Sequence, residues 1–393
     1  MKISQRAQQI PAFQAMEFGK HAAALEAAGH DVIRFNLGEP DFGAPPAVIE
    51  ALRTLADGRA LPYTAATGLP ALQQAISDFY RHKHDVTVAP ERIIVTAGAS
   101  AALLLVAAAL VDPGDEVLVG DPAYPCNRQF LAGFGARVKL VPTAAAQGFQ
   151  LDAARVRQHW GPHTHGLLLA SPSNPTGTLV PAAELQAICD WVRQQEGWRI
   201  IDEIYLDLSD PQDDGRFPRT VLATDPDAIV INSFSKYFGM TGWRLGWCVV
   251  PDALRPAIER LAQNFYICPP TPAQHAALAC FTPASLAVCE QRRQLLAERR
   301  ALVLDTLEHI GLPTATRPAG AFYVYLDIRH TGLDAATFCR RALHEAHVAL
   351  TPGLDFGELT AHSHVRLSFA TATEALQRGL TRLGDFVAGL RQG

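Results

Sequence analysis

Short apolar runs alternate with segments of helical spacing between about residues 45 and 275. Runs such as RIIVTAG, HGLLLASPS and AIVINSFS carry hydrophobic side chains at consecutive positions, so both faces of each strand would be buried. Strands of this kind, separated by helices, are typical of a parallel sheet that is covered by helices on both sides. The region therefore predicts an α/β fold with a mostly parallel central sheet.

The chain has 393 residues, more than one hydrophobic core usually serves, so we expect two domains. Residues 1–44 are predicted to form an N-terminal arm and part of a small domain, and residues 45–280 a large domain. Residues 281–393 contain long helical segments, the strand-like run GAFYVYLDI and further mixed elements. This last part predicts a smaller α+β domain, linked to the large one by helices.

The amino-acid composition limits which binding partners and which cellular compartment we expect. The net charge is −5 and no run of Lys and Arg forms a basic stripe, so nucleic acid is not expected as a partner. Seven scattered cysteines, without a C-x-x-C pair, argue against a disulfide framework and favour a reducing cytoplasm. The longest apolar run, residues 101–111, is shorter than the ~20 residues that span a bilayer. It predicts a buried helix, and no membrane contact is expected.

Two places have alternating histidines, His82 with His84 and His362 with His364. Neither pair is matched by the set of carboxylates or cysteines that a metal site would require. We therefore expect no metal and interpret both pairs as solvated loops.

The chemistry is expected at the carboxyl ends of the strands, where open α/β sheets bind their ligands. After RIIVT, Gly98, Ala99 and Ser100 stand where a strand turns into an apolar helix. Free backbone N–H groups, the helix dipole and the hydroxyl there suit an anion, although an ordinary helix start explains the same residues.

Two more strand ends carry polar groups. In SPSNPTG, Asn174 precedes a proline, which indicates a turn that either presents the amide or has no further role. In RIIDEIY, Asp202 ends an apolar strand. A buried carboxylate is costly without a partner, so Asp202 either forms a structural pair or holds a positively charged ligand atom.

The segment SFSKYFGMTGWRLGW is the most informative of the strand ends. Ser233, Ser235, Lys236 and Arg244 bring hydroxyls and two cations together beside glycines, which suits a phosphate. The order G-x-x-x-x-G-K-[ST] of nucleotide-binding loops is absent. Our hypothesis is a catalytic lysine whose pKa is lowered by burial and by a neighbouring cation, and the alternative is a solvated surface lysine.

Nine motifs together resemble the class I/II aminotransferases, which are fold-type I pyridoxal-phosphate enzymes. In order they are NLGEPDF, YTAATGLPALQQAI, TAGASAAL, DPAYP, SPSNPTGT, IIDEIY, SFSKYFGMTGWRLGW, GAFYVYLDI and HVRLSFA, and they run from about residue 30 to 370. Each motif alone is modest, but the series with similar spacing is very specific. The resemblance implies a large cofactor-binding domain and a small domain built from both chain ends.

The resemblance also implies roles for the residues around the cofactor, pyridoxal 5'-phosphate. Lys236 would hold it as a Schiff base and then move a proton between substrate and cofactor. Asp202 would pair with the pyridine nitrogen. Tyr205 and Asn174 would hydrogen-bond the ring's O3', and Tyr124 would stack on the ring face.

For the phosphate, the resemblance implies backbone groups, hydroxyls and a guanidinium, from Gly98, Ala99, Ser100, Ser233, Ser235 and Arg244. Tyr63 matches a tyrosine that reaches the cofactor of the neighbouring subunit, which implies a homodimer. A buried core tyrosine is the alternative.

For the substrate, Arg366 would clamp the α-carboxylate, with Gly38 and Asn174 as further contacts. The alternative for Arg366 is a structural ion pair, because a buried charge needs a partner. Tyr323 and Phe18 are expected near the substrate side chain from their positions alone. Ser100 stands where some relatives that use acidic substrates have a lysine, so an aspartate-specific enzyme has no support.

The function implied is transfer of the amino group of an L-amino acid to a 2-oxo acid, in a ping-pong mechanism through Lys236. One alternative on the same scaffold is β-elimination from a sulfur amino acid. A second is a non-catalytic sensor that binds the cofactor. Such sensors carry an added DNA-binding domain, whereas this sequence starts almost directly on the arm.

Overall fold

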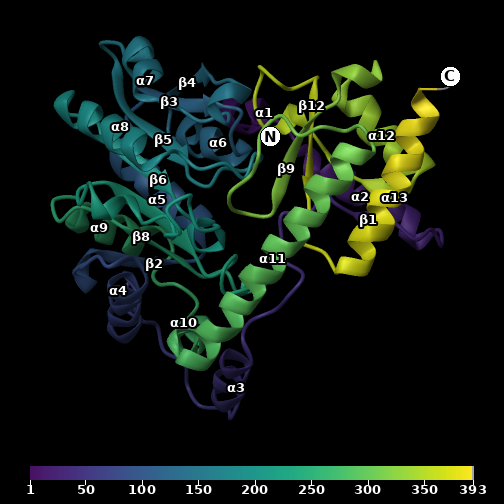
Figure 1. The fold of residues 1–393 in the computed structure, drawn as a ribbon. Coiled ribbons are helices and arrows are strands. Elements are labelled where there is room, and N and C mark those ends of the chain that lie inside the picture. The colour runs from purple at the N-terminus through teal and green to yellow at the C-terminus, as the bar shows by residue number, and fades with distance from the viewer. Residues whose placement is uncertain (392–393) are drawn as a thin grey trace.

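A seven-stranded sheet forms the centre of the larger part of the molecule (Figure 1). The computed structural model describes residues 1–391. Every neighbouring pair in the sheet is parallel except those of β8, which runs antiparallel to both β2 and β7. In spatial order the strands are β2 (Ile93–Thr96), β8 (Gly246–Val249), β7 (Ile229–Ser233), β6 (Trp198–Asp202), β5 (Thr164–Ala170), β3 (Glu116–Asp121) and β4 (Arg137–Pro142). The mostly parallel sheet expected from the sequence is confirmed.

Both faces of this sheet are buried, and successive residues of one strand enter different hydrophobic clusters. In β6, Ile200 belongs to one cluster and Ile201 to the other, as the two-residue period of a strand requires. Helix α5 packs on the face of Ile200, whereas α4 and α8 contribute to the opposite cluster. The surrounding helices are α4 (Pro70–His84), α5 (Ala99–Leu110), α6 (Pro125–Gly133), α7 (Ala153–His159), α8 (Ala182–Gln194), α9 (Arg255–Phe265) and α10 (Thr271–Ala277).

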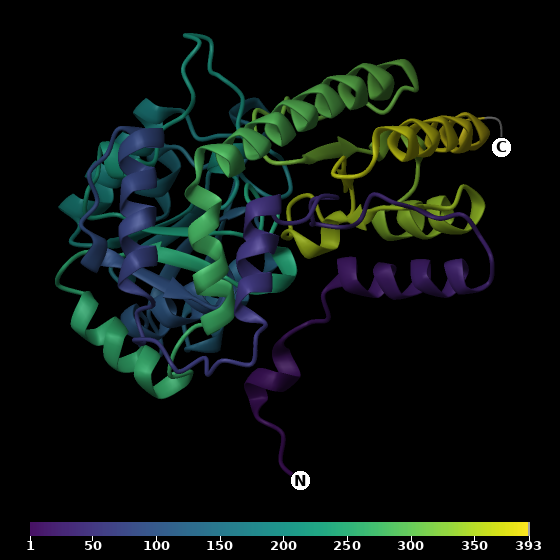
Figure 2. The same ribbon diagram turned by 90° about the horizontal axis from the view of Figure 1, so that it is seen from below.

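A second, smaller part is built from both ends of the chain. Its antiparallel sheet has the order β11 (Thr351–Pro352), β12 (His364–Ser368) and β9 (Tyr323–Asp327). Strand β1 (Ile33–Arg34) pairs in parallel with β10 (Val348–Ala349). Figure 2 shows the N-terminal α2 (Gln14–Ala27) beside α12 (Ala335–Glu345) and α13 (Thr373–Leu390). The first residues, with α1 (Gln5–Gln9), extend away from this body.

Helix α11 (Pro283–His309) connects the two parts, running from beside α10 toward α13 (Figure 1). Its 27 residues correspond to about 40 Å of helix. The side chain of Thr282 accepts a hydrogen bond from the Ser285 N–H, and a proline follows at the first helical position, so the start is well defined. The domain boundaries after residues 44 and 280 stay predictions.

The other short elements are α3 (Pro46–Leu55) and the 3-10 helices η1 (Pro90–Arg92), η2 (Ala145–Gln147), η3 (Leu206–Leu208), η4 (Val221–Ala223), η5 (Thr241–Trp243), η6 (Leu278–Phe281), η7 (Arg329–Thr331) and η8 (Gly353–Asp355). Among the helices of residues 1–391, none is both long and apolar enough to cross a membrane.

Candidate active site

The polar strand ends singled out in the sequence meet at one edge of the large sheet. Asp202 is the last residue of β6, Asn174 follows β5 and Lys236 follows β7. These three strands are parallel neighbours, so their carboxyl ends lie side by side. The small part adds Arg366 from β12, whose guanidinium reaches Asn174. Residues far apart in the sequence therefore form one polar site between the two sheets.

Lys236 lies in this site with its amine partly buried. Its Nζ donates a hydrogen bond to the Gly38 carbonyl at 2.6 Å and lies 5.7 Å from the centre of the Tyr205 ring. Burial lowers the pKa of the Lys236 amine to about 8, with a smaller opposing effect of the Glu39 charge. A share of the amine is then unprotonated near neutral pH, as a nucleophilic amine must be. The solvated surface lysine considered above does not fit this position.

Asp202 is a buried carboxyl that lacks a cation. It is 4% exposed, and Oδ1 accepts a hydrogen bond from the Ile204 N–H at 3.2 Å. Burial raises the pKa of Asp202 to about 7, against the lowering effects of that N–H and of the Lys236 charge. Within the described chain Asp202 forms no ion pair. Such a carboxyl suits a positively charged ring nitrogen brought by a ligand.

Arg366 is the complementary case, a buried guanidinium without an anion. Nη1 donates to Asn174 Oδ1 at 2.9 Å, and Nη2 donates to the Asn36 carbonyl at 2.8 Å. Its Nε has no hydrogen-bond partner, and the side chain forms no ion pair with any carboxylate of residues 1–391. A fully buried cation in this state suits the carboxylate of a ligand.

A close approach at the start of α5 explains why a glycine stands there. Gly98 has φ +91°, and a Cβ at this position would lie 2.6 Å from Nη2 of Arg244. A larger residue would be strained at this φ and would displace the guanidinium from the N-terminal end of α5, where Ala99 and Ser100 present the first helical N–H groups. A cation and free N–H groups together fit a phosphate.

Two serine hydroxyls complete the same corner of the sheet. Ser233 Oγ donates to Ser235 Oγ at 2.9 Å, and the Ser235 N–H donates to Ser233 Oγ at 3.0 Å. Both side chains are buried. Hydroxyls held in this way can turn toward phosphate oxygens without moving the backbone.

Three tyrosines line the site. The hydroxyls of Tyr205 and Tyr323 lie 2.8 Å apart, and the Arg366 guanidinium lies 4.5 Å from the centre of the Tyr323 ring. Tyr124 precedes α6 and meets the ring of Phe13 edge to face at 6.2 Å. The sequence pattern placed Tyr323 near the substrate but held no signal for its contact with Tyr205, which lies 118 residues away in the chain.

Tyr63 has no contact with this cluster, whereas Phe18 shares a hydrophobic cluster with Tyr205 and Tyr323. Tyr63 is 77% exposed, and no hydrogen bond or ring contact joins it to the site within the described chain. The buried core position considered for Tyr63 is therefore wrong. Phe18 is buried in the larger hydrophobic cluster.

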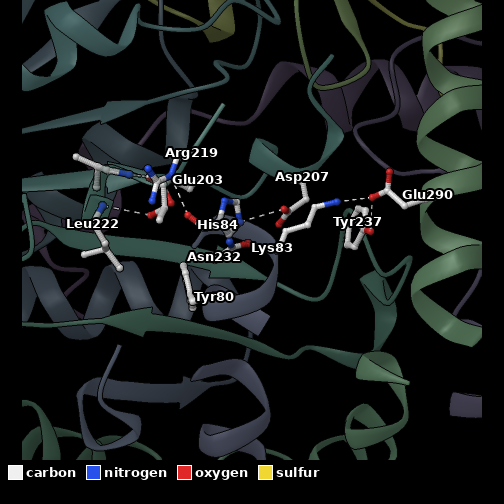
Figure 3. Close-up of polar contacts among 12 residues, drawn as sticks. Tyr80, Lys83, His84, Glu203, Asp207, Arg219, Leu222, Asn232, Tyr237 and Glu290 are labelled. Atoms are coloured by element: carbon white, nitrogen blue, oxygen red, sulfur yellow. Dashed lines mark hydrogen bonds and ion pairs between the residues drawn. The ribbon is translucent and has the colours of Figure 1, made fainter. Parts of the chain in front are cut away.

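A second, partly buried polar cluster lies where α4, α11 and the segment of residues 203–207 meet (Figure 3). We call it the rear cluster, and its members are Lys83, His84, Glu203, Asp207, Tyr237 and Glu290. His84 Nε2 lies 3.2 Å from Asp207 Oδ1, and Lys83 pairs with Glu290. Glu203 accepts a hydrogen bond from the Val221 N–H at 2.7 Å. These contacts connect α4 to α11 and place the end of α4 against the segment that contains Asp207.

The interpretation of the histidine pairs as solvated loops is wrong for three of the four residues, since His82, although exposed, lies within helix α4. His84 is buried at the end of α4, where it meets Asp207, and His364 is buried in β12, where its ring stacks on Tyr325 at 4.9 Å. The sequence has no signal for these partners because both come from distant segments. In residues 1–391 no group of three or more His, Cys, Asp or Glu side chains is placed to hold a metal ion.

Known proteins are similar to this chain in both sequence and fold. The family model for aminotransferases of class I and II matches residues 30–383. A valine–pyruvate aminotransferase of Mycobacterium tuberculosis is 37% identical over 96% of this chain and 97% of its own length. An aspartate/prephenate aminotransferase of Thermus thermophilus is 36% identical, over 97% of each chain.

Solved structures lead to the same family. A crystal structure of an aminotransferase from Mycobacterium tuberculosis has a TM-score of 0.95 at 36% identity, covering 99% of this chain and 100% of that one. The aspartate aminotransferase of Thermus thermophilus with maleate has a TM-score of 0.92 at 34% identity, covering 98% and 100%. The chain thus belongs to the class I and II aminotransferases, and it is a transaminase that moves an amino group from an amino acid to a 2-oxo acid.

Proposed function

We propose that the transamination uses pyridoxal 5'-phosphate, bound through a Schiff base to Lys236. The observation that carries this proposal is the meeting of three groups without ion partners in the described chain: the Lys236 amine, the Asp202 carboxyl and the Arg366 guanidinium. When bound, the cofactor supplies an electron sink for the amino acid's Cα. The remaining work belongs to side chains of this chain.

Lys236 acts as the base that removes the proton from the substrate's Cα and then delivers it to the cofactor. A pKa near 8 suits both steps close to neutral pH. Asp202 keeps the ring nitrogen protonated, and Tyr205 and Asn174 hold the ring oxygen. Tyr124 covers one face of the ring.

Two different arginines bind the substrate carboxylate and the cofactor phosphate. Arg366 holds the substrate carboxylate together with Asn174 and the Gly38 backbone. Arg244 and the start of α5 hold the phosphate, with the hydroxyls of Ser100, Ser233 and Ser235. Because the two guanidinium groups come from different parts of the fold, the ligand bridges those parts.

We further propose a homodimer in which Tyr63 of each subunit reaches the phosphate of the other. Its 77% exposure in a single chain supports this assignment, because the side chain is accessible to a second subunit. A cytoplasmic location is proposed from the seven cysteines, all of which are free thiols.

For the substrates we propose a neutral amino donor and a small 2-oxo acid such as pyruvate. The relative named for valine and pyruvate supports this choice, and Ser100 offers no cation to a second carboxylate. Relatives named for aspartate or arginine are of similar identity, so the choice needs a direct test.

The test is a panel of L-amino acids that includes valine, alanine, arginine, aspartate and cystathionine, added to the enzyme reconstituted with pyridoxal phosphate. Each product is identified after one turnover without acceptor, and again with pyruvate or 2-oxoglutarate. A 2-oxo acid that matches the donor, with the amine retained on the cofactor, supports transamination. Release of pyruvate and ammonia from a sulfur amino acid would establish elimination instead.

Lys236→Ala provides the control for the assignment of the lysine. The variant should lose the absorbance of the lysine-bound cofactor, and kcat should fall by about 10⁴-fold or more. An unchanged spectrum would move the linkage to another residue and overturn the proposal.

A further inference from the structure

Tyr323 contacts both the cofactor side and the substrate side of the proposed site. It begins β9 and is completely buried. Its hydroxyl lies 2.8 Å from that of Tyr205, and its ring faces the Arg366 guanidinium at 4.5 Å. A Cβ added to Gly38 would lie 2.9 Å from the same hydroxyl, so the Tyr323 oxygen rests against the residue whose carbonyl holds Lys236.

The direction of the Tyr205–Tyr323 hydrogen bond follows from a count of protons. Burial raises the pKa of both hydroxyls, so each carries its single proton at neutral pH. Only one of them donates to the other. If Tyr205 donates to the ring oxygen of the cofactor, then Tyr323 is left as the donor to Tyr205. A hydroxyl that accepts one hydrogen bond is a stronger donor of the next.

The ring of Tyr323 has a separate effect on Arg366. The guanidinium lies over the rings of Tyr323 and Phe356, at 4.5 and 5.2 Å. Its two terminal nitrogens are held by Asn174 and by the Asn36 carbonyl. Aromatic faces and these acceptors together fix the plane in which the guanidinium meets a carboxylate.

We propose that Tyr323 is a positioning residue with two separable actions: its hydroxyl directs the Tyr205 proton toward the cofactor, and its ring orients Arg366 toward the substrate carboxylate. The inference rests on the proposed function, since it needs the cofactor next to Tyr205. Tyr323 would then influence both the protonation of the cofactor and the recognition of the substrate carboxylate.

The test compares Tyr323→Phe, Tyr323→Leu and the matched control Tyr325→Phe in the holoenzyme. Tyr325 is the next but one residue in β9, is completely buried and pairs across the sheet with Arg366, but its hydroxyl lies 2.9 Å from Thr360 Oγ1, so the Phe variant removes a hydroxyl that does not contact Tyr205. The first readout is the pKa of the lysine-bound cofactor, from an absorbance titration. The second is the division of any loss between kcat and KM, and thermal unfolding checks that each variant folds.

Tyr323→Phe should raise the cofactor's pKa by about 0.5 to 1 unit, because Tyr205 then donates less strongly to the ring oxygen. Its KM for the amino acid should change less than about 2-fold, because the ring stays under Arg366. Tyr323→Leu should show the same pKa and in addition a KM higher by about 10-fold. Tyr325→Phe should match the wild type in both readouts.

A double variant tests whether the hydroxyl acts through Tyr205. In a Tyr205→Phe background, Tyr323→Phe should shift the cofactor's pKa no further, and an additional shift of the same size would overturn the proposal. Equal pKa values in Tyr323→Phe and Tyr325→Phe would also overturn it, while the wild type still titrates as a lysine-bound cofactor. Failure of the proposed function is distinct, because the wild type itself would then show no such titration.

Discussion

The site and the rear cluster contain the same kinds of side chain, but most charged groups of the rear cluster have a partner within the fold. The exception there is Glu203, a buried carboxyl without an ion pair in residues 1–391, whose pKa burial raises to about 7. In the site, Lys236, Asp202 and Arg366 are buried or partly buried and have no ion pair in the described chain. In the rear cluster, Lys83 pairs with Glu290, and His84 Nε2 lies 3.2 Å from Asp207 Oδ1 without a hydrogen bond between them. Charges paired within the fold stabilise it, whereas charges left without partners are available to a ligand and make the empty site less stable.

The largest effect is expected at Asp202. Asp202→Asn should lower kcat/KM by about 10²- to 10⁴-fold, because the amide does not keep the ring nitrogen protonated. The same change should stabilise the cofactor-free protein at pH 8, on the order of 1 to 3 kcal/mol, because a buried carboxylate is replaced by a neutral group.

The pH dependence of this gain has a defined sign. Burial raises the folded-state pKa of Asp202 to about 7, above its ordinary value near 4. The wild type therefore loses stability as the pH rises from about 4 to about 7, whereas the amide of the Asp202→Asn variant does not titrate. Urea unfolding of both cofactor-free proteins at pH 5 and pH 8 measures the difference. A less stable variant at pH 8 would assign Asp202 to a structural pair and remove it from the comparison.

Arg366 should show the next largest effect. Arg366→Lys removes the planar fork that meets a carboxylate, so kcat/KM should fall by about 10- to 100-fold, mostly through KM. The matched control is Arg300→Lys, at a buried arginine that is paired with Asp210. This control should lower the unfolding free energy and leave KM unchanged. Equal KM values in the two variants would contradict the role given to Arg366.

In the rear cluster, a change should act on stability and hardly on catalysis. His84→Leu leaves the buried Asp207 without its partner, so the free energy of unfolding should drop by about 2 to 4 kcal/mol. The turnover number should stay within about 3-fold of the wild type. The double variant His84→Leu with Asp207→Leu should regain part of the loss, because no unpaired charge remains. A large fall in kcat without loss of stability would show that the rear cluster belongs to the site.

The smallest effect is expected at Glu290. Burial disfavours its charged form, but hydrogen bonds from Lys83, Tyr237 and Arg293 outweigh this and lower its pKa to about 2. Its stabilising contribution is therefore complete above about pH 5 and is lost as the pH falls toward 2. Because the side chain is one-third exposed, we expect only about 1 kcal/mol. Glu290→Gln should remove this part of the acid dependence, measured by thermal unfolding between pH 3 and pH 7.

Sequence reasoning reached the fold and the main site residues because both depend on local patterns. The doubly apolar strands predicted the sheet, and polar residues at strand ends such as Asp202 and Lys236 marked its functional edge. Sequence reasoning could not predict contacts between segments that are far apart in the chain. His84 and Asp207 are 123 residues apart in number, and nothing local to His84 indicates burial against a carboxylate. The exposure of Tyr63 is likewise a property of the folded surface.

The pairing of β1 with β10 has a consequence for folding during synthesis on the ribosome. Ile33 pairs with Val348, and the Asn36 carbonyl accepts a hydrogen bond from Arg366. These contacts of the N-terminal segment can therefore form only after residues more than 300 positions later have been translated. At about 5 to 20 residues per second, this delay is roughly 15 to 60 s. During that time all strands of the large sheet are synthesised, while the N-terminal segment remains without its partner strand. The nascent chain is therefore unable to bind an amino acid until it is almost complete, and chaperones have their longest access to its N-terminal arm.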